Sequence, residues 1–351
     1  MKKLSILFLT LSLVGCSTDE PSNAQENMYF PPIGSTTWET KSVASLGWNE
    51  TAVEPLLAYL EEKHTKGFII LQNGKIVMEN YFNGHSATES WYWASAGKTL
   101  TATVVGIAEQ EGYLNTNNRV SDYLGTGWTS IPLAKENLII NKHLLTMTSG
   151  LNDQLGDDVS PDNLQYVADA GTRWAYHNVY VKLQDVVAQA SNQTWNSYFN
   201  SKLRDKIGMT GLWFSFNNSS VYRSNTRSMA RFGLLALNKG KWENTQVVPQ
   251  NYMQNATTTS QSINLAYGYL WWLNGKTSFH LPQSQFQFPG NLIVTAPADM
   301  YCALGKDDQK IYVVPSKKLV IIRMGEAADD SNATLSDFDE VLWEKINAVI
   351  N

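Results

Sequence analysis

A serine and a lysine three residues apart, Ser95 and Lys98, are the first candidates for chemistry in this chain. A serine hydroxyl is a poor nucleophile until a neighbouring group takes its proton. If a helix begins at Ser95, Lys98 lies one turn further on, on the same face as the hydroxyl, and the positive end of the helix favours negative charge there. The spacing therefore predicts a serine nucleophile that needs no histidine, although this spacing alone also arises by chance.

A phenol and an amide follow further along the chain, in the run Tyr176-His177-Asn178. A phenol titrates at about 10, so Tyr176 needs a nearby cation such as Lys98 to take up or pass on a proton. A buried lysine loses its charge readily and is then a base itself. Which of the two groups takes the proton from Ser95 stays open. We expect His177, between two site residues, to point away from them and to be structural.

Four segments resemble the class C β-lactamase-like serine hydrolases in content, order and spacing, over roughly residues 40–350. They are Trp93-Ala94-Ser95-Ala96-Gly97-Lys98, the run 144–151, Trp174-Ala175-Tyr176-His177-Asn178, and Met229 to Leu235 followed by Gly240-Lys241-Trp242 and Val247-Val248-Pro249. The resemblance implies an acyl-enzyme on Ser95, with Lys98 and Tyr176 moving protons. It also implies that Asn178 supports Lys98 and contacts the substrate amide or ester, and that no cofactor is needed.

The chain departs from this family at one element. The family usually places Lys or His, then Thr or Ser, then Gly on the strand that faces the nucleophile, where this chain has Ala303-Leu304-Gly305-Lys306. Gly305 is retained, and the resemblance implies that the backbone N–H groups of Lys306 and Ser95 form an oxyanion hole. The side chains that hold the carboxylate of a β-lactam or a peptide are missing.

The turn from Gly305 to Gln309 instead resembles that of the 6-aminohexanoate-dimer hydrolase and esterase branch. We therefore expect a serine hydrolase that cleaves esters or amides of small molecules. Two alternatives stay open. One is a β-lactamase or D,D-peptidase acting on cell-wall-type substrates, and the other is a catalytically silent binding lipoprotein.

The elements that must position these residues follow from hydrophobic spacing and turn signals. We expect helices over 50–64 and 334–350, a hairpin around Asn73-Gly74, and strands over 300–304, 310–314 and 319–324. Strands thus gather at both ends of the sequence. The pattern predicts an α/β (α+β) fold with one antiparallel sheet flanked by terminal helices and a mostly helical inserted subdomain. The resemblance implies the same β-lactamase/transpeptidase-like fold.

The amino terminus is typical of an exported bacterial lipoprotein. A basic pair and a short apolar run precede Leu13-Val14-Gly15-Cys16, which resembles a lipoprotein processing site. We expect a signal peptide over 1–15, lipid on Cys16 with a flexible tether to residue 37, and a hydrolase domain over 38–351. Within that domain the sheet part covers about 38–112 and 236–351, and the helical part about 113–235. The lipid would hold the protein to a membrane, in the periplasm or at the outer membrane or cell surface.

Charge, histidine spacing and cysteine count indicate which partners and cofactors are not expected. The net charge is −5 and no long basic run occurs, so nucleic acid is not an expected partner. The five histidines lack metal-binding spacing, and no metal is expected. If Cys16 carries lipid, Cys302 has no partner and is expected to be a buried core thiol. Three aspartates, at 157, 158 and 162, form either a solvated loop or a substrate entrance. Nothing in the sequence indicates an oligomeric state.

Overall fold

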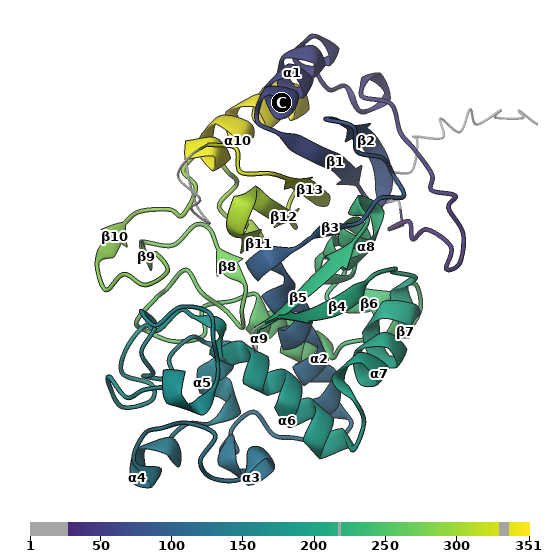
Figure 1. The fold of residues 1–351 in the computed structure, drawn as a ribbon. Helices are drawn as coiled ribbons and strands as arrows, with labels where there is room; N and C mark the ends of the chain where they lie inside the picture. Colours follow the sequence, from purple (N-terminus) through teal and green to yellow (C-terminus); the bar gives the residue numbers. More distant parts are fainter. Residues whose placement is uncertain (1–26, 217–218, 330–336) are drawn as a thin grey trace, which may run out of the picture.

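The computed structural model describes residues 27–216, 219–329 and 337–351 (Figure 1). The predicted signal peptide and Cys16 lie outside the described residues. The helices are α1 (Val53–Glu62), α2 (Lys98–Gln110), α3 (Ser121–Leu124), α4 (Leu133–Glu136), α5 (Asn141–Leu145), α6 (Lys182–Ser191), α7 (Trp195–Phe199), α8 (Thr226–Leu237), α9 (Gln250–Ala256) and α10 (Asp337–Ile350). None of these helices is both long and apolar enough to cross a membrane.

Strands from both ends of the chain build one antiparallel sheet of six strands, in the order β2-β1-β13-β12-β11-β8. They are β1 (Thr65–Gln72), β2 (Lys75–Tyr81), β8 (Trp272–Leu273), β11 (Tyr301–Gly305), β12 (Gln309–Val314) and β13 (Leu319–Gly325). The predicted hairpin is confirmed, since Asn73 and Gly74 both have positive φ between β1 and β2. The three predicted C-terminal strands are also confirmed, within one residue at each end.

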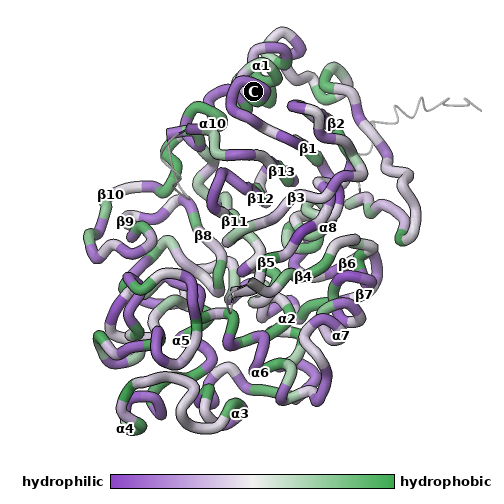
Figure 2. The backbone as a smooth tube through the Cα atoms, in the orientation of Figure 1, coloured by the Kyte–Doolittle hydropathy of each residue, from purple (hydrophilic) through white to green (hydrophobic). Residues whose placement is uncertain are grey.

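Helices cover both faces of this sheet. On one face α10 lies beside α1, and its predicted apolar side chains Phe338, Leu342, Ile346 and Val349 are buried. Figure 2 shows hydrophobic and hydrophilic residues interspersed along α10, as an amphipathic helix requires. On the other face α8 packs against β1, β12 and β13. The structure therefore places α8 with the sheet, whereas the expected boundary placed it in the helical part.

A small sheet that the sequence does not predict joins β3 (Trp91–Tyr92), from the expected sheet part, to two strands from the region expected to be helical. It has the order β3-β5-β4, with β4 (Leu212–Phe216) and β5 (Ser219–Ser224). The chain leaves β3 directly into the turn that carries Ser95, and the backbone N–H of Trp93 donates to Tyr222 O at 2.9 Å. Two further pairs are β6 (Lys241–Trp242) with β7 (Thr245–Gln246), and β9 (Ser278–His280) with β10 (Gln287–Pro289).

The described part of the expected tether lies against the domain. Tyr29 N donates to Asn73 O at 3.1 Å, and the Arg231 guanidinium donates to Pro31 O and Pro32 O at 3.2 and 3.0 Å. The Trp38 indole donates to Gly74 O at 2.8 Å. Because these contacts fix the backbone, the folded part of the chain begins before residue 38, the boundary expected from composition.

Candidate active site

Ser95 lies in a short 3-10 turn, η3 (Ala94–Gly97), that leads directly into α2. Ala94 has a φ of 46°, a conformation that a residue with a side chain keeps only where its surroundings hold it. Trp93 supplies that support, since it is fully buried and its indole donates to Ser224 Oγ at 2.8 Å. Lys98, the first residue of α2, places its Nζ 2.7 Å from Ser95 Oγ. The structure therefore brings the two residues together on one face, as the spacing predicts.

Lys98 is buried, with 2% of the residue's surface exposed. Its Nζ donates to Asn178 Oδ1 at 3.2 Å and lies 5.1 and 4.6 Å from the ring centres of Tyr176 and Tyr180. Burial lowers the pKa of Lys98 to about 7, partly offset by the negative charge of Asp157. A large share of the Lys98 side chains is therefore uncharged at neutral pH.

Tyr176 is held within a cluster of aromatic rings. Its ring centre lies 5.9 Å from that of Trp174, 5.6 Å from that of Trp272 and 6.1 Å from that of Tyr267. Burial raises the pKa of Tyr176 to about 12, although a hydrogen bond with the Ser95 side chain acts in the opposite direction. The group beside Ser95 is therefore a neutral phenol with a proton to give.

Asn178 connects Lys98 to the opposite wall of the site. Its Nδ2 donates to Asp157 Oδ1 at 3.0 Å and to Ser219 Oγ at 3.3 Å, while its Oδ1 accepts from Lys98. Of the three loop aspartates, Asp157 lines the cavity described below. Asp158 instead accepts from Ser160, within its own loop.

Gly305 and Lys306 lie at the end of β11, against the turn that carries Ser95. A Cβ on Gly305 would lie 2.5 Å from Trp93 O and 3.0 Å from Ala96 N, so only glycine allows this approach. Both Ser95 and Lys306 are first-turn residues of short helices, where backbone N–H groups have no acceptor within the helix. This placement agrees with the pair of donors that the resemblance implies.

A cavity of about 430 Å³ joins these groups. Of the six site residues expected in the folded domain, five line this cavity and Gly305 does not. The sequence motifs do not predict several other polar lining residues, among them Tyr92 in β3, Ser219 and Ser220 in β5, and Gln283 in the loop between β9 and β10. No motif marks them, because each reaches the cavity only through tertiary packing.

His177 also lines the cavity, whereas we expected it to point away. Burial and the nearby charges of Lys98 and Arg173 lower the pKa of His177 to about 3, so its imidazole is neutral at physiological pH. Cys302 is a fully buried free thiol whose pKa burial raises, which confirms its expected place in the core. Among the described residues no cluster of three or more His, Cys, Asp or Glu side chains forms a metal site.

Comparison with known proteins finds relatives of this chain both by sequence and by fold. An uncharacterized protein of Alkalihalophilus pseudofirmus is 24% identical over 72% of this chain and 81% of its own. A solved structure named "Putative 6-aminohexanoate-dimer hydrolase", from Bacillus anthracis, has a TM-score of 0.69 at 17% identity, covering 92% of this chain and 89% of its own. A β-lactamase from Mycobacterium bovis has a TM-score of 0.62 at 17% identity, covering 85% of this chain and 98% of its own.

These two structural likenesses concern the fold, a mixed arrangement of antiparallel sheet and helices of the β-lactamase/transpeptidase kind. The family assignment rests on the sequence itself. The Beta-lactamase family matches residues 58–334, which include Ser95, Lys98, Tyr176, Asn178 and Gly305. The chain therefore belongs to the Beta-lactamase family of serine hydrolases.

Proposed function

We propose that this protein cleaves esters or amides of small molecules through an acyl-enzyme on Ser95. One observation carries the proposal: a lysine amine whose pKa is about 7 lies 2.7 Å from the serine hydroxyl. A neutral amine at that distance can take the hydroxyl proton, which makes the serine a nucleophile.

In the proposed acylation step, Lys98 takes the proton as Ser95 Oγ bonds to the substrate carbonyl carbon. The carbonyl oxygen becomes an oxyanion, which the N–H groups of Ser95 and Lys306 stabilise. The oxyanion then collapses to a carbonyl and the C–O or C–N bond to the leaving group breaks, as the Tyr176 phenol gives that group its proton; Lys98 returns a proton to Tyr176. Water attacks the acyl-enzyme with the same groups acting in reverse, and this restores Ser95.

Two features of the site support small neutral substrates over β-lactams. Ala303 and Leu304 stand where the family usually has a cation and a hydroxyl, so neither side chain can hold a carboxylate. The described cavity wall also contains the carboxylate of Asp157, which repels an anionic substrate.

A second candidate function is hydrolysis of β-lactams or cell-wall peptides, and one observation favours it. Lys306 lines the cavity and adds a basic residue to its wall, despite its shifted place in the sequence. Turnover of a chromogenic cephalosporin that exceeds turnover of p-nitrophenyl esters would favour this function over ester and amide cleavage.

The deciding experiment is labelling of the full chain with a fluorophosphonate probe, beside Ser95→Ala. We expect the parent to be labelled and the variant to remain unlabelled while its circular dichroism stays unchanged. A folded parent that takes up no probe would contradict the catalytic proposal and would favour the binding lipoprotein instead.

We also propose that the protein is exported and held to a membrane by lipid on Cys16, as the processing-site pattern supports. The expected result is incorporation of labelled palmitate into the parent and its loss in Cys16→Ser. Equal labelling of both proteins would contradict the assignment.

A further inference from the structure

The turn that presents the Lys306 amide has an unusual backbone. Asp307 and Asp308, the two residues after Lys306, both have φ of 57°. Each non-glycine residue in this region costs of order 1 kcal/mol or more, and such conformations persist where the surroundings impose them. The position of the Lys306 N–H therefore depends on what holds these two residues.

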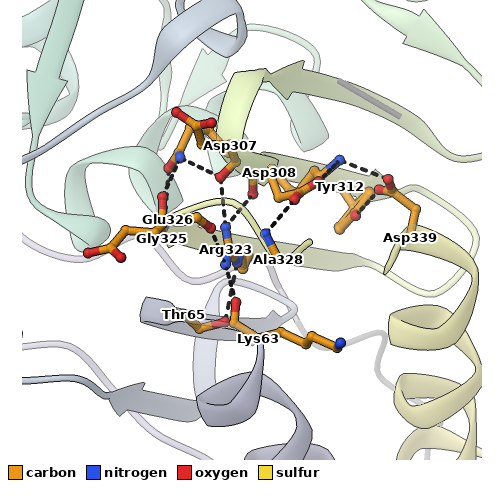
Figure 3. A network of polar contacts seen from close by, with 12 residues as sticks. Lys63, Thr65, Asp307, Asp308, Tyr312, Arg323, Gly325, Glu326, Ala328 and Asp339 are labelled. Atoms are coloured by element: carbon orange, nitrogen blue, oxygen red, sulfur yellow. Dashed lines mark hydrogen bonds and ion pairs between the residues drawn. The ribbon is translucent and has the colours of Figure 1, made fainter. Parts of the chain in front are cut away.

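A buried arginine holds the turn from below (Figure 3). Arg323 in β13 is fully buried, and its Nη1 donates to the carbonyl oxygens of Asp307 and Asp308 at 2.9 and 3.1 Å. Its Nη2 donates to Lys63 O at 2.7 Å and Glu326 O at 2.8 Å, and its Nε donates to Thr65 Oγ1 at 3.2 Å. A guanidinium has five N–H donors, and these five bonds use all of them.

Gln309 holds the same turn from the side. Its Nε2 donates to Asp307 O at 2.7 Å and to Gly325 O at 2.6 Å, and its Oε1 accepts from Gly325 N at 3.2 Å. The backbone oxygen of Asp307 thus accepts from two buried side chains, which anchor it to β13.

The side chain of Asp307 is held from the opposite direction. The Tyr92 hydroxyl donates to its carboxylate. Tyr92 is the last residue of β3 and lies three residues before Ser95 in the chain. Asp307 therefore joins the strand that leads into the nucleophile turn to the strand that carries Arg323.

We propose that Tyr92, Asp307 and Arg323 are positioning residues that fix the Lys306 N–H relative to the Ser95 N–H. The inference rests on the proposed function, since it concerns how that site stabilises its oxyanion. One oxyanion donor contributes about 10²–10³ in kcat, and a donor must be held within about 0.5 Å to contribute fully. Loosening the turn therefore reduces the stabilisation of the transition state more than it reduces the affinity for the substrate.

The test compares Tyr92→Phe and Asp307→Asn with a matched control, Tyr81→Phe. Tyr81 also donates its hydroxyl to a carboxylate, Glu79, at 2.6 Å, but on the edge strand β2. We expect Tyr92→Phe and Asp307→Asn each to lower kcat by about tenfold with little change in KM. The control is expected to keep its kcat.

The affinity for a boronic acid inhibitor separates a positioning role from a merely structural one. The tetrahedral adduct of such an inhibitor places an oxygen in the oxyanion site, so its affinity depends on the position of the two N–H groups. We expect its affinity to fall by the same factor as kcat in both variants, and the double variant to lose little more than either single one. Variants that match Tyr81→Phe in kcat and inhibitor affinity would overturn the inference.

Arg323→Lys provides a second measurement, because an ammonium has three donors where the guanidinium uses five. If this variant folds, it should show the same paired loss of kcat and boronic acid affinity. If it does not fold, Tyr92→Phe and Asp307→Asn decide. A parent that fluorophosphonate does not label would overturn the proposed function as well, whereas a labelled parent with unaffected variants would overturn this inference alone.

Discussion

The protonation state of one residue, Lys98, governs the proposed chemistry. A base must be uncharged to accept a proton, so activity should rise as the pH rises through the pKa of Lys98, which is about 7. We expect kcat/KM for a p-nitrophenyl ester to fall about tenfold per pH unit well below pH 7 and to level off above it. A rising limb centred above pH 9 would instead favour the Tyr176 phenolate as base.

Tyr176→Phe separates the roles of the two candidate bases. If Tyr176 donates a proton to the leaving group, its loss should lower kcat by about 10²-fold or more and leave the pH of the rising limb unchanged. The effect should be greatest for amides, whose leaving groups need the proton most. Displacement of the limb in this variant would contradict the assignment of Lys98 as base.

The sequence predicts Ser95, Lys98, Tyr176 and Asn178, because each belongs to a local motif. It leaves the choice of base open, because that choice depends on burial. The aromatic rings that bury Lys98, such as that of Tyr180, belong to residues about 80 positions further along the chain. The sequence around Lys98 therefore does not show that it is buried. The place of His177 in the cavity wall was not predicted either. A 3-10 helix, η5 (Asn178–Val181), begins directly after His177, so neighbouring side chains do not point to opposite sides as they would along a strand.

At the scale of elements, the close contact of β11 with η3 depends on Gly305, which has no side chain. Gly305→Ala places a Cβ 2.5 Å from Trp93 O, so the strand must move away from Ser95. We expect kcat to fall by about 10²-fold, comparable with the loss of one oxyanion donor. Steady-state kinetics with a p-nitrophenyl ester measures the change.

Gly97→Ala is the control for this prediction. It lies in the same motif, but a Cβ there would meet its nearest neighbours at 3.7 Å, an ordinary contact. Its φ is −65°, which alanine adopts readily, so we expect kcat within about twofold of the parent and stability equal or up to about 1 kcal/mol higher. Equal losses in both glycine variants would show that contact at Gly305 is not the cause.

The sequence predicts the elements whose hydrophobic residues follow a clear pattern, and it does not predict those without one. The strands β11 to β13 are buried on both faces and have continuous apolar runs. The hairpin of β4 and β5 lacks such a pattern, since Leu212 and Phe214 are exposed while Trp213 between them is buried. All three are large and apolar, so no alternation marks the strand.

At the scale of the whole molecule, a buried charge network ties the last helix to the sheet (Figure 3). Lys310 is fully buried, and its Nζ lies 2.8 Å from Asp339 Oδ2 in α10 and 3.1 Å from Asp308 Oδ1. Tyr312 also donates to Asp339 Oδ1 at 2.5 Å. Apolar periodicity predicts that α10 packs on the sheet, but it says nothing of a carboxylate on the packed face.

Removal of this carboxylate should be costly. We expect Asp339→Ala to lower the free energy of unfolding in urea by about 3 kcal/mol, because it leaves buried charge uncompensated. Glu62→Ala is the control: Glu62 pairs with Lys63 at 3.7 Å on the surface, and its loss should change stability by less than about 0.5 kcal/mol. Equal stabilities of the two variants would contradict the role given to the network.

The pairing of β1 with β13, in which Thr65 lies opposite Gly325, also constrains the order of folding. The central sheet cannot close until β13 has been synthesised, and contacts this distant in sequence form slowly. The two amide donors of the proposed oxyanion hole also belong to distant segments, η3 and the end of β11, whose contact this sheet supports. A nascent chain that ends before β13 would therefore carry its serine and lysine beside an unfinished sheet, and we expect hydrolytic activity to arise only after β13 has been added.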